Sequence, residues 1–484
     1  MKNLPPFRLE NFPQDCHFAD MRWGFCAVLI GTSLLMCLNA SAAVIIWNGE
    51  AKVDNWSGGG NNGSNNWVGK TTPVAGDSII FSSTTRLTPN NNTPTGTSYS
   101  GITFSTAAGA FTLNGNAITL DGSIINQSTN LQTINMALIL NATQTLNAAN
   151  GAILISKVIS GVGGINKTGS ATLTVSSDNT YTGATTVSAG TLKAGVASVA
   201  NVSGAFGNNS QVTLANAPGV VLDITGYDTQ IGSLTGGGTN GGNVTLGAAR
   251  LTVGGANTSP LAYVGIISGN GGVTKIGTGT QIFSGANTYT GTTIISGGSL
   301  YLNNSSGSAT GTGSVTVQNG ATLGGSGTAA GETIIDGNLN PGNHLGVISF
   351  GGALRLQTTA TTTIEIVGAT RGTQYDGINV GSALTYGGAL VMDFRSVFGA
   401  STTFNLFDFV SQSSSFETVS LTGEYSGSMA KNDAGVWNLT SGSHSWIFTQ
   451  STGDLNFANS GVIPEPRAAL LGGLGVLLLF RRRR

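Results

Sequence analysis

The residues best suited to chemistry lie close to the C-terminus. They form three consecutive segments. The first is a short element with one acidic residue, Pro464, Glu465 and Pro466, and the second is a run of apolar residues at 468–480. The third is a cluster of positive charge: Arg481, Arg482, Arg483 and Arg484. A helix over 468–480 would be about 20 Å long, whereas the hydrocarbon core of a bilayer is roughly 30 Å thick. The arginines are expected to stay on the cytoplasmic side. We therefore predict a transient membrane association through this C-terminal helix, and the alternative is a permanent tail anchor.

The prolines give this element a second property. Proline fixes its own backbone angle and disfavours helix in the residue before it, so the segment around Glu465 stays extended. The extended backbone leaves Glu465 available for recognition, and the family resemblance given below implies that a membrane enzyme recognises it.

Enzymatic chemistry has little support in the rest of the chain. Residues 44–460 carry 12 Lys and Arg against 17 Asp and Glu, without a dense cluster of either sign. Glycan cleavage needs paired carboxylates in one groove. Four aspartates fall instead in Gly- or Asn-rich turns, where such a side chain caps the backbone: Asp54, Asp77, Asp228 and Asp376. The histidines of this region, His344 and His444, are far apart in the chain. We predict a non-enzymatic protein with no cofactor and no metal, and the lack of a basic patch argues against nucleic acid as a partner.

Aromatic residues offer a different kind of chemistry, because a flat ring can stack on a sugar. Trp47, Trp56 and Trp67 lie in the stretch "WNGEAKVDNWSGGGNNGSNNW". One interpretation is a cover for the first turn of a repetitive fold, whose hydrophobic end would otherwise be exposed. The other is a glycan-stacking platform. Tyr181 and Tyr289 raise the same choice between packing and sugar binding.

The N-terminal region has the layout of a secretory signal peptide. From Met21 it shows one arginine, an apolar run over 23–38 and a small-residue site. The cleavage residues are Ala40, Ala42 and Ala43, with the cut expected after Ala42 or Ala43. The apolar run is shorter than the ~20 residues of a comfortable membrane span, which disfavours a membrane anchor. All three cysteines lie within the first 37 residues, so the processed chain would contain none.

An internal repeat determines the expected fold. The stretch "ISGVGGINKTGSATLTVSSDNTYTGATTVSAGTL" (159–192) recurs as "ISGNGGVTKIGTGTQIFSGANTYTGTTIISGGSL" (267–300), with 18 of 34 positions identical. Short Val-, Ile- and Thr-rich strands alternate with glycine turns, and 74 of 484 residues are glycine. Strands this short gain stability when they stack as coils. We predict a mainly β chain folded as a right-handed parallel β-helix, with β-sandwich modules as the alternative.

The repeat resembles the autotransporter-associated β-strand repeat. The resemblance is carried by Gly163-Gly164, Lys167, "NTYTG" at 179–183 and Leu192, and by the equivalent residues from Gly271-Gly272 to Leu300. It implies a passenger-like β-helix. A true autotransporter ends in a membrane barrel, whereas the apolar run and arginines described above close this chain.

That C-terminal segment resembles the PEP-CTERM sorting signal. Its three parts occur in the family's order over 462–484. The resemblance implies an exosortase-type membrane protease as a partner and delivery to the surface, outer envelope or extracellular matrix of a Gram-negative-type bacterium.

These observations predict five regions. They are a leader with its signal peptide (1–43), a Trp-rich N-terminal cap (44–100), a β-solenoid (101–350), a C-terminal β region (351–460) and the sorting signal (462–484). The predicted function is that of an exported structural or adhesive surface protein, associated with exopolysaccharide or cell-envelope glycan. The alternative is a secreted β-helical protein that binds or degrades glycans.

Overall fold

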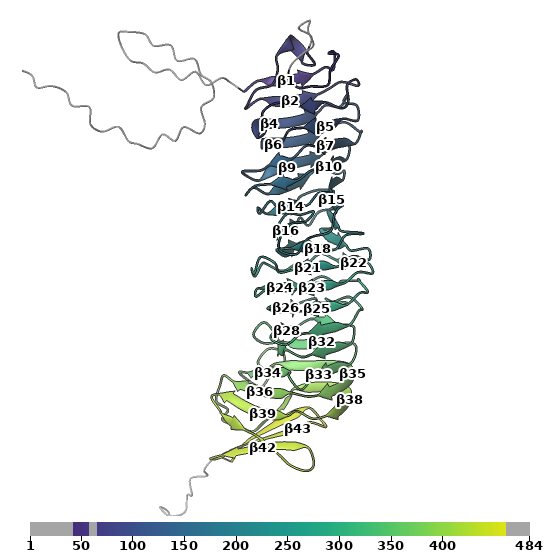
Figure 1. Cartoon of the computed structure of the whole chain (residues 1–484). Helices are drawn as coiled ribbons and strands as arrows, with labels where there is room; N and C mark the ends of the chain where they lie inside the picture. Colours follow the sequence, from purple (N-terminus) through teal and green to yellow (C-terminus); the bar gives the residue numbers. More distant parts are fainter. Residues whose placement is uncertain (1–41, 58–64, 461–484) are drawn as a thin grey trace, which may run out of the picture.

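The computed structural model describes residues 42–57 and 65–460, and these residues form one elongated column of short strands (Figure 1). Within these residues, the regular structure is β apart from one 3-10 turn, η1 (Val68–Lys70). Strand pairing is parallel from β1 through β36, so the predicted parallel β-helix is confirmed and the sandwich alternative is wrong.

Sheet I forms one face of the first half of the column. Its residues alternate between buried and half-exposed, which is the pattern of strands with one face on a core. In order of pairing its strands are β1 (Val44–Trp47), β2 (Ser78–Phe81), β4 (Thr97–Phe104), β6 (Ile118–Asn126), β9 (Gln144–Ala148), β12 (Ile165–Thr168), β14 (Thr185–Val187), β16 (Gln211–Leu214) and β19 (Ser233–Gly236), with β8 (Leu138–Ile139) and β11 (Ile159–Ser160) beside them.

Sheet II forms the second face of this half. From β3 to β20, each of its strands follows a sheet I strand along the chain, so one coil of this half contributes a strand to both sheets. In chain order the strands are β3 (Asn90–Asn91), β5 (Thr112–Gly115), β7 (Gln132–Asn135), β10 (Ile153–Ile155), β13 (Leu173–Val175), β15 (Thr191–Ala194), β17 (Val221–Asp223), β20 (Asn243–Thr245) and β22 (Ile267–Ser268).

Sheets III and IV continue the column. Sheet III contains β18 (Thr229–Ile231), β21 (Leu251–Val253), β23 (Val273–Lys275), β25 (Thr293–Ile295), β27 (Val315–Val317), β29 (Thr328–Ala329), β30 (Thr333–Ile335), β32 (Val347–Phe350), β33 (Leu354–Leu356), β35 (Gly377–Tyr386) and β38 (Phe407–Ser414). Sheet IV contains β24 (Thr280–Phe283), β26 (Ser299–Leu302), β28 (Thr322–Gly325), β31 (Asn338–Pro341), β34 (Thr361–Ile366), β36 (Ala389–Phe394), β39 (Thr418–Gly423) and β40 (Gly427–Ser428). Tyr263 bridges Gly236 of β19 to Phe283 of β24, so sheet IV prolongs the face of sheet I.

The two repeat copies occupy different faces of the solenoid. In the first copy β12 lies in sheet I and β13 in sheet II, whereas their equivalents β23 and β24 lie in sheets III and IV. The coils between the copies differ in length: Ile165 pairs with Thr185, but Thr185 pairs with Val212 after a longer loop. The second copy is therefore turned by one face about the column axis.

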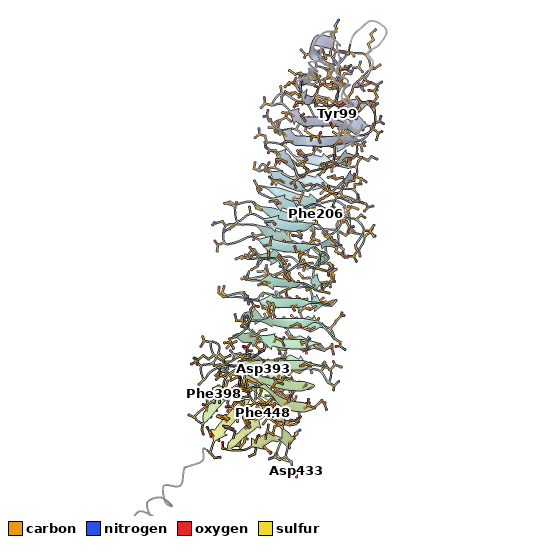
Figure 2. The ribbon with its side chains drawn as sticks, turned by 90° about the vertical axis from the view of Figure 1, so that its left-hand side faces the viewer. Tyr99, Phe206, Asp393, Phe398, Asp433 and Phe448 are labelled. Atoms are coloured by element: carbon orange, nitrogen blue, oxygen red, sulfur yellow. The ribbon has the colours of Figure 1, made fainter. Side chains whose placement is uncertain are left out.

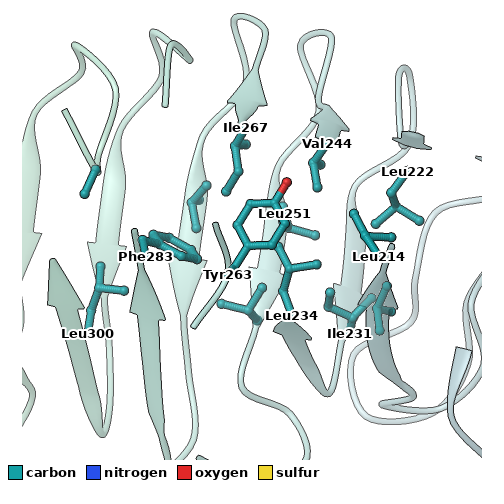
Figure 3. Close-up of a cluster of buried hydrophobic side chains, with 14 of the residues drawn as sticks. Leu214, Leu222, Ile231, Leu234, Val244, Leu251, Tyr263, Ile267, Phe283 and Leu300 are labelled. Carbon is teal, nitrogen blue, oxygen red and sulfur yellow. The ribbon is translucent and has the colours of Figure 1, made fainter. Parts of the chain in front are cut away.

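A single hydrophobic core runs the length of the column. Figure 3 shows part of it, where leucine, isoleucine and valine side chains from successive coils stack around Tyr263 and Phe283. Both aromatic side chains are fully buried. Each coil covers the apolar surface of the next, and this mutual burial is the main favourable contribution to stability in a solenoid.

The two ends differ from the predicted region boundaries. Residues 44–100 already supply parallel strands β1 to β4, so the first coils and their cover are one unit. At the other end parallel pairing continues past 350, because β34, β36 and β39 keep stacking. The column is then closed by an antiparallel sheet, whose strands are β37 (Thr402–Asn405), β41 (Ala430–Lys431), β42 (Val436–Ser441), β43 (His444–Thr449) and β44 (Asp454–Asn459).

Candidate functional site

The three N-terminal tryptophans are core residues. The side chains of Trp47, Trp56 and Trp67 are at most 1% exposed. The Trp47 and Trp67 rings meet edge to face with centroids 5.0 Å apart, and the Trp67 indole N–H donates to the Trp56 carbonyl at 2.7 Å. The prediction of a glycan-stacking platform is wrong, because the three rings fill the interior of the first described coils instead of facing solvent.

The repeat positions hold the turns of the solenoid together. The buried Asn179 side chain accepts the Ile159 N–H at 2.7 Å and donates to the Ala205 carbonyl at 2.8 Å. Asn287 makes the equivalent bonds to the Ile267 N–H at 2.8 Å and the Ala309 carbonyl at 2.6 Å. Each asparagine therefore satisfies backbone groups of its neighbouring coils.

The repeated tyrosine and lysine are also internal. The Tyr181 hydroxyl bonds to Thr185 at 2.8 Å inside the core, and burial raises the pKa of Tyr181, so packing rather than sugar binding is confirmed. The Lys167 ammonium donates to three backbone carbonyls at 2.7–2.9 Å. Lys275 donates to three equivalent carbonyls. Burial lowers the pKa of each lysine to about 8.

Three of the four turn aspartates accept backbone N–H groups, but only Asp77 accepts one from its own turn; the other donors are distant in the chain. Asp77 accepts two backbone N–H groups, Asp228 accepts the Arg250 N–H at 2.8 Å, and Asp376 accepts those of Gly346 and Glu365, both at 2.9 Å. Burial raises the pKa of Asp376 to about 7.

The remaining titratable groups do not converge on one site. Asp54 pairs with Arg86 at 3.3 Å instead of capping backbone. His344 is exposed, whereas His444 stacks on Phe457 with centroids 5.6 Å apart in the closing sheet. Among residues 42–57 and 65–460, no three His, Cys, Asp or Glu side chains gather as metal ligands.

A groove at the junction with the closing sheet could not be found from sequence. It measures about 480 Å³ and is bordered by segments 356–358, 385–387 and 414–417 together with Lys431. The Lys431 ammonium donates to the Ser415 hydroxyl at 2.6 Å, and Ser415 bonds in turn to Gln450 at 2.8 Å. A general base must accept the serine proton, whereas this ammonium donates, so the pair is a hydrogen-bonding surface. Figure 2 shows Phe448 within the adjoining closing sheet.

A column of neutral polar side chains runs along the outer face of sheet I. We call it the polar ladder, and strand register aligns its members on five consecutive strands, at the spacing of about 4.8 Å between neighbouring strands: Thr145, Asn166, Thr186, Thr213 and Thr235. All five side chains are partly or fully exposed. Their hydroxyl and amide groups both donate and accept hydrogen bonds.

The corresponding columns of sheets II and III are interrupted. In sheet III the aligned residues Thr274, Ile294 and Thr316 alternate polar with apolar. In sheet II the column passes through the ion pair of Lys193 and Asp223, whose charged atoms lie 3.3 Å apart. Sheet IV carries a second uninterrupted column of the same length, so the polar ladder is one of two neutral hydrogen-bonding columns: Thr280, Ser299, Thr322, Asn338 and Thr361 form the other.

Comparison with known proteins identifies the repeats. Residues 165–194 and 273–302 both match the model of one family, described as the passenger-associated-transport-repeat. The two matches coincide with the strands and turns held by the asparagine, tyrosine and lysine described above. A stretch of 146 residues is also 42% identical to the adhesin BmaC autotransporter of Brucella suis biovar 1 (strain 1330). That stretch is 28% of this chain and 4% of the relative, so the chain corresponds to a small part of that adhesin.

Several predicted site residues lie outside the described residues. They are Ala40, the recognition element Pro464, Glu465 and Pro466, and Arg481, Arg482, Arg483 and Arg484. Sorting through these residues stays a prediction. Ala42 and Ala43 are described and exposed, directly before β1. In the part of the chain that the structure covers, no helix is long and apolar enough to cross a membrane.

Proposed function

We propose that this chain is an exported, non-enzymatic surface protein of a Gram-negative-type bacterium that adheres to glycans. The observation that carries the proposal is the polar ladder on a parallel solenoid whose repeats match a passenger family. The likeness to a stretch of an adhesin supports the same class of function.

The chemistry of the polar ladder favours a neutral glycan. Sugar hydroxyls need partners that both donate and accept hydrogen bonds, and threonine and asparagine side chains supply both. The ladder contains no charged residue, so binding should change little with salt, unlike binding that rests on ion pairs.

The binding experiment uses two matched double variants. The ladder variant is Thr186→Glu with Thr235→Glu, and the control is Thr274→Glu with Thr316→Glu on sheet III. The two residues of each pair lie two strands apart, so the same charge is added at the same spacing. We expect the ladder variant to lose at least tenfold in retention on cell-envelope glycan and exopolysaccharide, with the control unchanged. Equal retention of both variants would refute adhesion through the ladder.

The proposal includes sorting by an exosortase-type protease that recognises Pro464, Glu465 and Pro466. The apolar run at 468–480 would hold the chain in the membrane for a limited time before removal. Intact mass and the C-terminal peptide of surface protein test this step. We expect wild type to end near Pro466 and Glu465→Ala to keep its tail in the membrane fraction. Surface protein that retains Arg481 would instead favour a permanent anchor.

A further inference from the structure

The strongest unexplained feature near the N-terminus is the buried carboxylate of Asp77. Its side chain lies just before β2, and the residue is 3% exposed. One carboxylate oxygen accepts the Val74 N–H at 2.8 Å and the other accepts the Ala43 N–H at 3.0 Å. Among the ion pairs of the described residues, none includes Asp77. A buried carboxylate without a cation is costly.

Among the described residues, Ala43 is the first that makes a backbone hydrogen bond. Its carbonyl accepts the Ser78 N–H at 2.9 Å, which starts the ladder between β1 and β2. Across the described residues, the backbone of Ala42 makes no such bond. A chain that begins at Ala43 therefore keeps the hydrogen bonds that Ala43 makes to Asp77 and Ser78.

We infer that the mature protein begins at Ala43, and that its new N-terminal ammonium forms an ion pair with Asp77. This inference rests on the proposed export. Cleavage after Ala42 converts the amide nitrogen that already faces Asp77 into a cation, without moving it. The hydrogen bond to the carboxylate then gains a positively charged donor and becomes an ion pair.

Cleavage one residue later would have the opposite effect. It would remove both the Ala43 nitrogen and the Ala43 carbonyl, and Asp77 would keep only the Val74 N–H. The structure therefore distinguishes between two cuts that the small-residue pattern of the sequence leaves open.

The first test is the N-terminal peptide of the exported protein, produced from the full chain in a bacterium. We expect the sequence to start Ala43-Val44-Ile45. A start at Val44 on protein displayed at the surface would overturn this inference and leave the proposed function intact. Protein retained in the cell with its leader would contradict the export on which both depend.

The second test measures the ion pair itself. Mature chains that begin at Ala43 are compared with chains that begin at Ser41, each with Asp77 or with Asp77→Asn. Tryptophan fluorescence reports unfolding in denaturant, and three of the five tryptophans after Ala43 lie in the first coils: Trp47, Trp56 and Trp67. We expect the free amine at Ala43 to raise the unfolding midpoint only when Asp77 is present. An equal effect in both backgrounds, or none in either, would refute the pair.

Asp77→Asn removes a buried charge and is open to misfolding. A separate measurement then uses wild-type chains alone. The rate at which an acylating reagent modifies the N-terminal amine should be at least tenfold lower in the chain that begins at Ala43 than in the chain that begins at Ser41. Equal rates would contradict the ion pair.

Discussion

The substitution Asn179→Ala tests the role assigned to the repeat asparagine. It removes an acceptor from the buried Ile159 N–H and a donor from the buried Ala205 carbonyl. A buried backbone group left without a partner costs about 1–3 kcal/mol. Two such groups give roughly 4 kcal/mol, which corresponds to about a thousandfold change in a local opening equilibrium.

Hydrogen exchange at the Ile159 amide is the direct assay, because this proton is held by the asparagine side chain. We expect its exchange to accelerate by about a thousandfold in Asn179→Ala, on the same free-energy scale. Asp178→Ala is the matched control, since Asp178 is exposed and adjacent. Asn287→Ala should have the same effect at Ile267 in the second copy. An acceleration below tenfold, or one equal to that of the control, would refute this reasoning.

Three further predictions concern the packing and charge of the coils. Gly164→Ala places a methyl group 2.0 Å from the Ala184 carbonyl oxygen of the next coil and should lower the free energy of unfolding by about 3 kcal/mol. Gly399→Ala is the control, because its methyl group meets open space and should leave the free energy of unfolding unchanged. Equal denaturant midpoints for the two variants would contradict this prediction. Trp56→Ala should lower the free energy of unfolding by about 3–5 kcal/mol and unfold the first coils, which would appear as new protease cleavage within 44–104. An unchanged pattern of protease cleavage would contradict the role of the aromatic core. Lys167 and Lys275 have a pKa of about 8 in the folded state, against an ordinary value of 10.5. Between pH 8 and pH 10.5 the unfolded chain therefore binds more protons than the folded chain, so the free energy of unfolding should rise with pH over this range. Denaturant midpoints at pH 7 and pH 10 test this, and Lys167→Met with Lys275→Met should remove the rise.

The fold could be predicted from the repeat in the sequence, whereas the roles of individual residues could be predicted only in part. Alternating apolar residues and paired glycines are local features, so parallel coils follow from them. Gly164 shows why the glycines recur, because neighbouring backbones approach too closely there for a side chain. The choice between packing and sugar binding for Trp47 or Tyr181 depends on which coil covers the ring, and that is not a local property.

The sequence by itself determined the class of fold, the internal repeat and the scarcity of paired carboxylates, because each depends on residue types at short spacing. Only the tertiary structure decided that the second copy is turned by one face, since this depends on loop lengths summed over several coils. The same is true of the polar ladder, which aligns Thr145 through Thr235 by strand register, and of the contact between Ala43 and Asp77. Residues distant in the chain become neighbours only when coils stack, so such surfaces carry no local sequence pattern.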